Sequence, residues 1–287
     1  MTDSWPVTEH GGWLKYDSEA SGLCNLSRAP IEAFERIKDE PHIVELTLKF
    51  RNAAIKGLST RHSLIRKYGD YRITLASSNT KSYRKKGSTL KEYIADMLKQ
   101  RAGQQIQRPA RRANETWYWF GDIDHQQWAD LLGKYKLPRE QLNTQSATLT
   151  YGIGGQFSGV PLHTHGAVFA ETLYGRKRWF IMHPDVRPDF DGEIDTSYSW
   201  SLRQPGELRS RVCAPHPLAD VLHDDTAAAL DVCRVSAPAP SALPNEEKMA
   251  RPVYVCTLAE GELLYVPAMW WHATLNLDET VFVSAFV

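Results

Sequence analysis

The second half of the chain, from Ser146 on, is a series of short apolar segments separated by glycine or proline. The segments are rich in β-branched and aromatic residues, and their sequences are ATLTYGI, VFAETLYG, KRWFIMHP, YVCTLAEG, LLYVP and TVFVSAFV. Runs this short, bounded by turn residues, are typical of β-strands in sandwiches and barrels. The pattern therefore predicts a mainly β core, and a jelly roll is one arrangement that suits it.

The preceding stretch, residues 29–145, mixes helical and extended patterns, so we expect it to form an α/β flank beside the core. The expected helices are 29–38, 60–68 and 88–100, and the expected strands are 43–50, 71–77 and 117–120. Thr60 is the expected N-cap of the second helix, and Ser88 with Lys91 forms an imperfect capping box for the third. We interpret residues 117–120, WYWF, as a core strand in preference to an aromatic ligand box.

Two regions have no regular pattern. Residues 1–28 are polar, and we expect an irregular N-terminal arm there. The stretch 236–248, SAPAPSALPNEEK, is rich in proline, alanine and serine and has too few apolar side chains to build a core. We therefore expect one long, partly disordered insertion at about residues 185–250, inside a core unit of residues 146–287.

The charge of the chain is balanced, since Lys+Arg and Asp+Glu both total 34. General binding to nucleic acid or to a membrane surface depends on excess basic charge, so we expect neither role. No apolar run approaches the roughly 20 residues that are needed to span a bilayer.

The cysteines are far apart in the sequence and include no C-x-x-C pair; they are Cys24, Cys213, Cys233 and Cys256. We therefore expect neither a zinc ribbon nor a disulfide framework, which favours a reducing compartment. The N-terminal sequence shows neither the basic nor the apolar region of a signal peptide. These features predict a cytoplasmic or nuclear protein.

Three histidines are candidate metal ligands. His163 and His165 are two residues apart in GVPLHTHG, and on a strand two such side chains point to the same face. Two buried, hydrogen-bonded histidines would explain this pair equally well. His272 lies much later, after the apolar segment LLYVP and two tryptophans, and an antiparallel sheet can bring it to the pair. Three such ligands would leave other positions on the metal open.

The surroundings of these histidines resemble a known family. Residues Gly261, Pro267, His272 and Asn276 follow the spacing G-x5-P-x4-H-x3-N, which resembles the second cupin motif, and H-x-H resembles the first. YGRKRWF followed by Pro184, and GELLYVPAMWWHATLN, are similar to the jumonji C (JmjC) branch of the cupins. The likeness extends in order along the chain through SSNTKSY, WFGD, SGVPLHTHG, ETLYGRKRWF and WWHATLNLD.

The resemblance implies a double-stranded β-helix of eight strands, with iron(II), or another divalent metal, and 2-oxoglutarate as partners. His163 and His272 match the outer metal ligands of the branch. Lys177 matches the lysine that holds the distal carboxylate of 2-oxoglutarate in its hydroxylases. Strand alternation places Lys177 on the face opposite to Arg176 and Arg178, which favours an inward side chain over a solvated one. An inward lysine would need an anionic partner, because burying its charge alone is costly. Asn276 is expected to hydrogen-bond close to the site. The resemblance also implies the endoplasmic reticulum lumen as an alternative location, if the N-terminus is incomplete.

His165 departs from the pattern of the branch, whose active hydroxylases and demethylases carry Asp or Glu at this position. A neutral imidazole gives iron less compensating charge than a carboxylate. Two functions are therefore open. The first is an iron- and 2-oxoglutarate-dependent protein hydroxylase, and the second is a non-catalytic cupin-like regulatory or binding protein. Both imply a protein substrate or partner, and no zinc-binding cysteine cluster points to a histone demethylase.

Glu171 offers a third alternative, because the broader cupin site contains three histidines and a glutamate shortly after H-x-H. Glu171 follows His165 closely and shares a strand face with Phe169 and Leu173. We expect it either to bind the metal or hold a histidine tautomer, or to face the solvent, and the sequence favours neither. The first role would suit an enzyme that acts on a small molecule.

Overall fold

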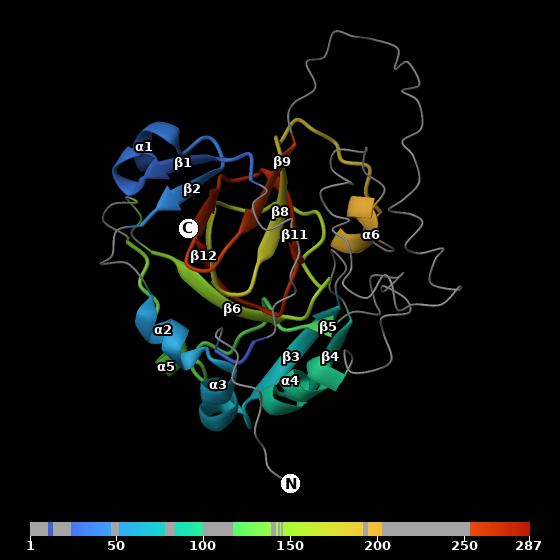
Figure 1. The fold of residues 1–287 in the computed structure, drawn as a ribbon. Helices are drawn as coiled ribbons and strands as arrows, with labels where there is room; N and C mark the ends of the chain where they lie inside the picture. The colour runs from blue at the N-terminus through green and yellow to red at the C-terminus, as the bar shows by residue number, and fades with distance from the viewer. Residues whose placement is uncertain are drawn as a thin grey trace, which may run out of the picture.

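In the part of the chain that the structure describes, nine strands form two core sheets that face each other (Figure 1). The computed structural model describes residues 11–13, 24–46, 52–77, 84–99, 117–138, 142, 144, 146–191, 195–202 and 253–287. The larger sheet has the order β1 (Ser27–Pro30), β2 (His42–Glu45), β10 (Leu263–Val266), β7 (Val168–Tyr174), β12 (Thr280–Phe286) and β6 (Thr148–Gly154). The smaller sheet has the order β11 (Trp271–Asn276), β8 (Lys177–Met182) and β9 (Tyr254–Leu258). The prediction of a mainly β, jelly-roll core is confirmed.

The segment from Phe157 to His163 runs beside β11 without forming a regular strand. The backbone N–H of Phe157 donates to the carbonyl of Asn276, and His163 and His272 exchange two backbone hydrogen bonds. The segment thereby adds a fourth, irregular member to the smaller sheet. The expectation that His163 and His165 lie in a regular strand is wrong, because His163 forms an isolated bridge with His272 and His165 lies outside the described strands.

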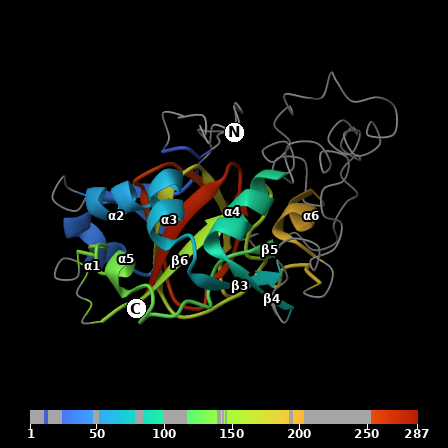
Figure 2. The same ribbon diagram turned by 90° about the horizontal axis from the view of Figure 1, so that it is seen from below.

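Helices and a third sheet cover the outer face of the larger sheet (Figures 1 and 2). They are α2 (Ala53–Leu58), α3 (Arg61–Tyr68), α4 (Leu90–Lys99), α5 (Ala129–Leu132) and the sheet β4 (Lys85–Thr89), β3 (Arg72–Ser77), β5 (Trp117–Tyr118). Leu64 and Trp128 from this flank pack with Tyr151 and Val283 of the larger sheet in one buried cluster. A short 3-10 turn (Ile31–Ala33) and α1 (Phe34–Ile37) lie beside β2. No described helix is long and apolar enough to cross a membrane.

The starts of two helices show which capping predictions are correct. The hydroxyl of Thr60 accepts a hydrogen bond from the Ser63 N–H at 3.1 Å, so the predicted N-cap of α3 is confirmed. Helix α4 starts later than predicted, because Ser88 still pairs with Ile73 in the β3–β4 ladder. Its capping box consists of Thr89 and Glu92, which exchange two hydrogen bonds, so the predicted box of Ser88 and Lys91 is wrong.

The structure confirms one further expectation for the flank and changes others. Strand β2 ends at Glu45, and residues 47–50 and 78–83 lie outside the described residues. WYWF does form a core strand, since β5 is followed by a bridge from Trp119 to Ile153. Part of the expected N-terminal arm is anchored: Trp13 is fully buried, and its indole N–H donates to the Ser59 carbonyl at 2.8 Å.

The expected insertion at 185–250 contains a helix at its beginning. Helix α6 (Ser197–Leu202) packs Trp200 against Phe180, on the face of β8 that points away from the larger sheet. Residues 192–194 and 203–252, which include SAPAPSALPNEEK, lie outside the described residues, so the expected disorder there stays a prediction.

Cys24 and Cys256 form a disulfide, which the expectation of no disulfide framework did not anticipate. The chain just after Cys24 runs along β9, where the Asn25 N–H donates to the Val255 carbonyl and the Asn25 side chain accepts from the Val255 N–H. This pairing brings together two cysteines that are 232 residues apart in the sequence. Spacing along the chain could not reveal it.

Candidate metal centre

Three histidines meet at one end of the space between the sheets. His272 lies on β11, and the two backbone hydrogen bonds with His163 set the two rings side by side, with centroids 4.2 Å apart. The ring of His165 lies 4.5 Å from that of His272. One nitrogen of each ring lies within 4.8 Å of the others. The structure thus brings together the three histidines that the sequence singled out.

Each ring is oriented by a backbone carbonyl. The Nδ1 atoms of His163, His165 and His272 lie 2.7, 2.6 and 2.8 Å from the carbonyl oxygens of Pro161, Gly166 and Trp270. A carbonyl can only accept, so each Nδ1 carries the hydrogen, and each Nε2 of a neutral ring offers a lone pair. The Nε2 atoms of His165 and His272 face each other at 2.9 Å. Two lone pairs at this distance repel unless a proton or a cation lies between them.

The rings are in the protonation state that a metal requires. Burial lowers the pKa of His163 to about 4, and burial together with the two neighbouring rings holds the pKa of His272 well below its usual 6.5. Burial also lowers the pKa of His165. Two ligands about 2.1 Å from an ion and at right angles to each other are about 3 Å apart, close to the separation of the His165 and His272 Nε2 atoms. The residues present therefore fit a divalent transition metal ion.

Gly159 allows the histidine segment to lie close to β11. A Cβ atom at this position would lie 1.9 Å from the Thr274 carbonyl oxygen, so no larger residue fits without moving the backbone. We expect Gly159→Ala to lower the free energy of unfolding by about 1–3 kcal/mol or more, measured by denaturant titration. Gly57→Ala in helix α2 is the control: a Cβ there meets nothing within 4 Å, and alanine favours a helix. Equal stability of the Gly159 variant and the parent would contradict the close approach.

Lys177 and Asn276 form a buried polar pair in the same space. They are partners in the β8–β11 register, and the Lys177 ammonium donates to the Asn276 side-chain carbonyl at 3.0 Å. The amide N–H group of Asn276 donates to the Ser158 hydroxyl at 3.0 Å. Burial lowers the pKa of Lys177 to about 7. Lys177 is therefore inward, as strand alternation predicted, and Asn276 positions it.

Aromatic side chains fill the rest of the interior next to the histidines. The cavity that touches all three rings is lined also by Lys177, Trp179, Phe120, Phe282 and Phe286, with smaller residues between them, and its volume is about 20 Å³. A single water molecule needs roughly 10–15 Å³, whereas pockets for small-molecule ligands enclose roughly 300–1,000 Å³. A five-carbon dicarboxylate such as 2-oxoglutarate does not fit in this space. The histidines therefore fit the metal that the resemblance implies, whereas the space beside them does not fit 2-oxoglutarate.

Glu171 lies outside the histidine cluster. It points to the outer face of β7, where its carboxylate accepts a hydrogen bond from the Asn52 amide at 2.6 Å and contacts Tyr135, and it is almost fully buried. It is therefore neither a ligand of the cluster nor solvent-facing, and it holds no histidine tautomer, since backbone carbonyls do so. Burial raises its pKa to about 7. The third alternative, a three-histidine, one-glutamate site, loses its fourth ligand.

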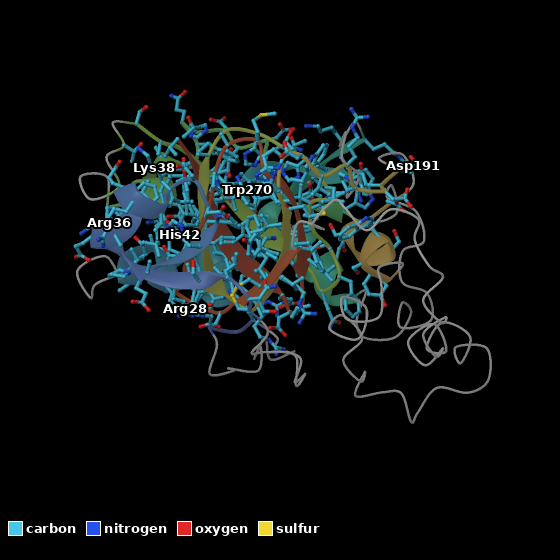
Figure 3. The ribbon with its side chains drawn as sticks, turned by 90° about the horizontal axis from the view of Figure 1, so that it is seen from above. Arg28, Arg36, Lys38, His42, Asp191 and Trp270 are labelled. Carbon is cyan, nitrogen blue, oxygen red and sulfur yellow. A yellow bond between two sulfur atoms is a disulfide. The ribbon has the colours of Figure 1, made fainter. Side chains whose placement is uncertain are left out.

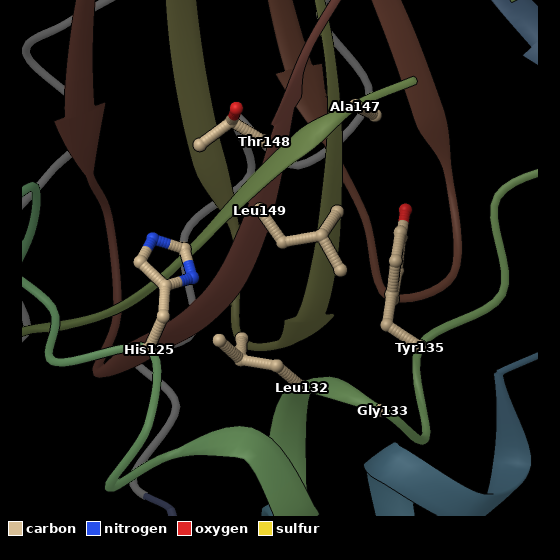
Figure 4. Close-up of a pocket in the computed structure, with 7 residues that line it drawn as sticks. All are labelled: His125, Leu132, Gly133, Tyr135, Ala147, Thr148 and Leu149. Carbon is tan, nitrogen blue, oxygen red and sulfur yellow. The ribbon is translucent and has the colours of Figure 1, made fainter. Parts of the chain in front are cut away.

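Trp270 and a separate hollow lie outside the histidine cluster. Trp270 is buried, with its ring 5.1 Å from that of His183, and Figure 3 shows it between the β1–α1–β2 side, which carries His42, and the side of Asp191. A larger hollow of about 590 Å³ lies between α5 and β6, lined by residues such as His125, Tyr135 and Leu149 (Figure 4). It contains none of the histidines of the cluster.

Sequence reasoning missed the phenylalanines that close the site. Phe282, Ser284 and Phe286 alternate along β12 and all line the cavity. Period-2 alternation in TVFVSAFV places these three residues on one face and could have identified them as a set. Which face of the strand turns inward is known only once β12 is seen between β7 and β6.

A core of two facing sheets with a histidine cluster between them at one end defines a cupin-like protein. The comparison with known families agrees: residues 32–286 match the family model of the cupin-like domain, and the chain belongs to this family. It is 35% identical to JmjC domain-containing protein 8 of Homo sapiens, over 82% of this chain and 72% of the relative. The resemblance to the JmjC branch is confirmed.

More distant relatives carry other names. The lysine-specific demethylase JMJ21 of Arabidopsis thaliana is 28% identical over 78% of this chain, but the match spans only 21% of that protein. The HSPB1-associated protein 1 of Mus musculus is 26% identical over half of this chain and 24% of its own length. These matches extend the family likeness to an enzyme and to a protein named for its association with another.

Proposed function

We propose that this protein binds one divalent transition metal ion through the Nε2 atoms of His163, His165 and His272. The convergence of three Nε2 atoms whose rings are held by backbone carbonyls carries the proposal. Neutral imidazoles suit iron(II), cobalt(II) and zinc(II), and iron(II) is the ion that the JmjC family favours. A bound ion would keep open positions, since three protein ligands do not fill the coordination sphere of an ion such as iron(II).

The test is a metal titration of the purified protein without oxygen. Iron(II), cobalt(II) and zinc(II) are each added to metal-free protein, and bound metal is counted after gel filtration. About one ion per chain is expected. The visible spectrum of the cobalt(II) form reports whether nitrogen ligands surround the ion. Binding of no ion by folded protein would overturn the proposal.

A second candidate function is an iron- and 2-oxoglutarate-dependent protein hydroxylase. The buried Lys177 favours it, because no carboxylate of the described residues pairs with this ammonium, and a bound dicarboxylate could do so. A bound iron ion would supply the activation of oxygen in such an enzyme. The test is conversion of 2-oxoglutarate to succinate with iron, ascorbate and air. Against this candidate stand His165 in place of an acid and the small cavity.

The cost of keeping Lys177 in the core gives a stability prediction. Burial lowers its pKa from the ordinary 10.5 to about 7, so between these values the unfolded chain binds more protons than the folded one, and stability falls as pH drops from 10.5 to 7. We expect Lys177→Met to raise the free energy of unfolding at pH 7 by roughly 1–3 kcal/mol. This gain should shrink towards pH 10.5.

The control for this prediction is Lys86→Met, on the exposed part of β4, which should change stability by less than about 0.5 kcal/mol. Denaturant titrations of both variants at pH 7 and pH 10 make the comparison. A Lys177→Met variant that is less stable than the parent at pH 7 would mean that an anion accompanies the lysine in the protein.

The function is also proposed to involve a protein partner, and an oxidising compartment such as the endoplasmic reticulum lumen. The disulfide between Cys24 and Cys256 supports the second part, because such bonds persist in oxidising compartments. The HSPB1-associated relative supports the first. Localisation of a tagged full-length protein and proximity labelling in cells test both parts, and a cytoplasmic or nuclear signal would contradict the compartment.

A further inference from the structure

The ring of Phe282 lies directly beside the ammonium of Lys177. The Lys177 ammonium is 3.8 Å from the centroid of the Phe282 ring and donates to the side-chain carbonyl of Asn276. A phenyl face attracts an ammonium only weakly compared with a carboxylate. The lysine that the family uses to hold a dicarboxylate is therefore covered by an aromatic ring of its own chain.

The backbone around Phe282 is arranged to hold the ring there. Phe282 pairs with Gly152 in the β12–β6 register, and a Cβ atom on Gly152 would lie 2.4 Å from the ring. The absence of a side chain at Gly152 thus makes room for the ring. The centroid of the Phe120 ring lies 5.1 Å from that of Phe282. The β12–β7 register shifts between Val281 and Phe282, and such an irregularity re-aims the side chain that follows it.

The space that the ring leaves is too small for an organic acid. The cavity of about 20 Å³ touches the histidines, Lys177 and Phe282 together, so it is the inner end of the candidate metal centre. It can hold one water molecule or a ligand of similar size. A phenylalanine side chain and a five-carbon dicarboxylate are comparable in length, so the ring and the acid would compete for the same volume.

We infer that Phe282 determines which ligands the site accepts: it excludes 2-oxoglutarate and other dicarboxylates, and it leaves room beside the metal only for water or a ligand of similar size. The inference deepens the proposed metal centre and rests on it for the second half of this statement. The exclusion itself follows from Phe282 and Lys177, whether or not a metal is bound. This role of Phe282 explains how the chain can keep the lysine of the JmjC branch although its cavity has no room for 2-oxoglutarate.

The experiment measures binding of 2-oxoglutarate by saturation-transfer NMR and calorimetry, without any turnover assay. Parent protein and the variants Phe282→Ala and Phe282→Leu are compared, each metal-free and zinc(II)-loaded. The parent is expected to bind more weakly than about 1 mM, and the variants at least about tenfold more tightly than the parent. Adding Lys177→Met to either variant should abolish the new binding. Phe282→Leu removes less volume than Phe282→Ala, which protects the test if the alanine variant does not fold.

Phe286→Ala is the matched control, because Phe286 also lines the cavity but lies beside His165, with ring centroids 4.9 Å apart. This variant should not bind 2-oxoglutarate. Binding by the parent below 1 mM would overturn the inference, and so would folded Phe282 variants that bind nothing, or equal binding by the Phe286 variant. The metal-free samples separate the two proposals: Lys177-dependent binding there supports the role of Phe282 even if the zinc(II) titration shows no metal site.

Discussion

Replacement of His163 by alanine is expected to reduce metal binding from about one ion per chain to less than about a tenth. The remaining pair, His165 and His272, would hold an ion with two imidazoles and without the ring that the β11 bridge positions. Metal should also stop stabilising the fold. An ion present at 100 times its dissociation constant stabilises a folded protein by about 2.7 kcal/mol, which corresponds to a rise in melting temperature of roughly 5 °C or more. Metal analysis and thermal melts with and without added zinc(II) measure both effects.

His183→Ala is the matched control for this prediction. His183 lies near the rim, in contact with Trp270 and with its Nδ1 3.2 Å from the Asp185 carboxylate, but it is not part of the cluster. This variant should keep the metal and the metal-dependent shift in melting temperature. If the His163 variant retains a full equivalent of metal, the ion binds elsewhere and the proposed centre is wrong.

The core and the histidine cluster could be predicted from the sequence for two physical reasons. Short apolar segments with turn residues between them have few ways to bury their side chains other than as strands of a closed double sheet, and all six such segments are strands. His163 and His272 could be paired because the motif spacing fixes where each lies relative to its turn. The sequence was informative wherever a local pattern had one structural solution.

The role of Glu171 could not be predicted, although strand alternation correctly placed it on one face with Phe169 and Leu173. Every residue of β7 is buried, because the cavity lies on one face of the strand and the helices lie on the other. Alternation separates two faces, but it identifies the inner one only when the outer face is polar. The covering of Lys177 by Phe282 was out of reach for a related reason, since it depends on a register shift in β12.

Removal of the disulfide by the double replacement Cys24→Ser and Cys256→Ser is expected to lower the free energy of unfolding by about 2–5 kcal/mol. The two cysteines are 232 residues apart, so the bond closes most of the chain into one loop and removes much of the freedom of the unfolded state. Denaturant titration of the parent and the double variant measures the difference. A reductant should destabilise the parent by a similar amount and leave the double variant unchanged, which separates the bond from other effects of the reductant.

The same variant tests whether the disulfide supports the metal centre. Cys256 lies directly opposite Trp179 in the β8–β9 register, and the Trp179 ring lines the cavity 5.9 Å from the ring of His272. Because the disulfide ties the N-terminal segment to the strand that pairs with that tryptophan, loss of the disulfide should weaken zinc(II) binding by roughly tenfold. This effect is smaller than the one expected for the loss of a histidine. A digest of the non-reduced parent must yield a cross-linked peptide of Cys24 and Cys256. If that peptide is absent from folded, metal-binding protein, the bond is not part of the native structure, and an oxidising compartment is no longer supported by it.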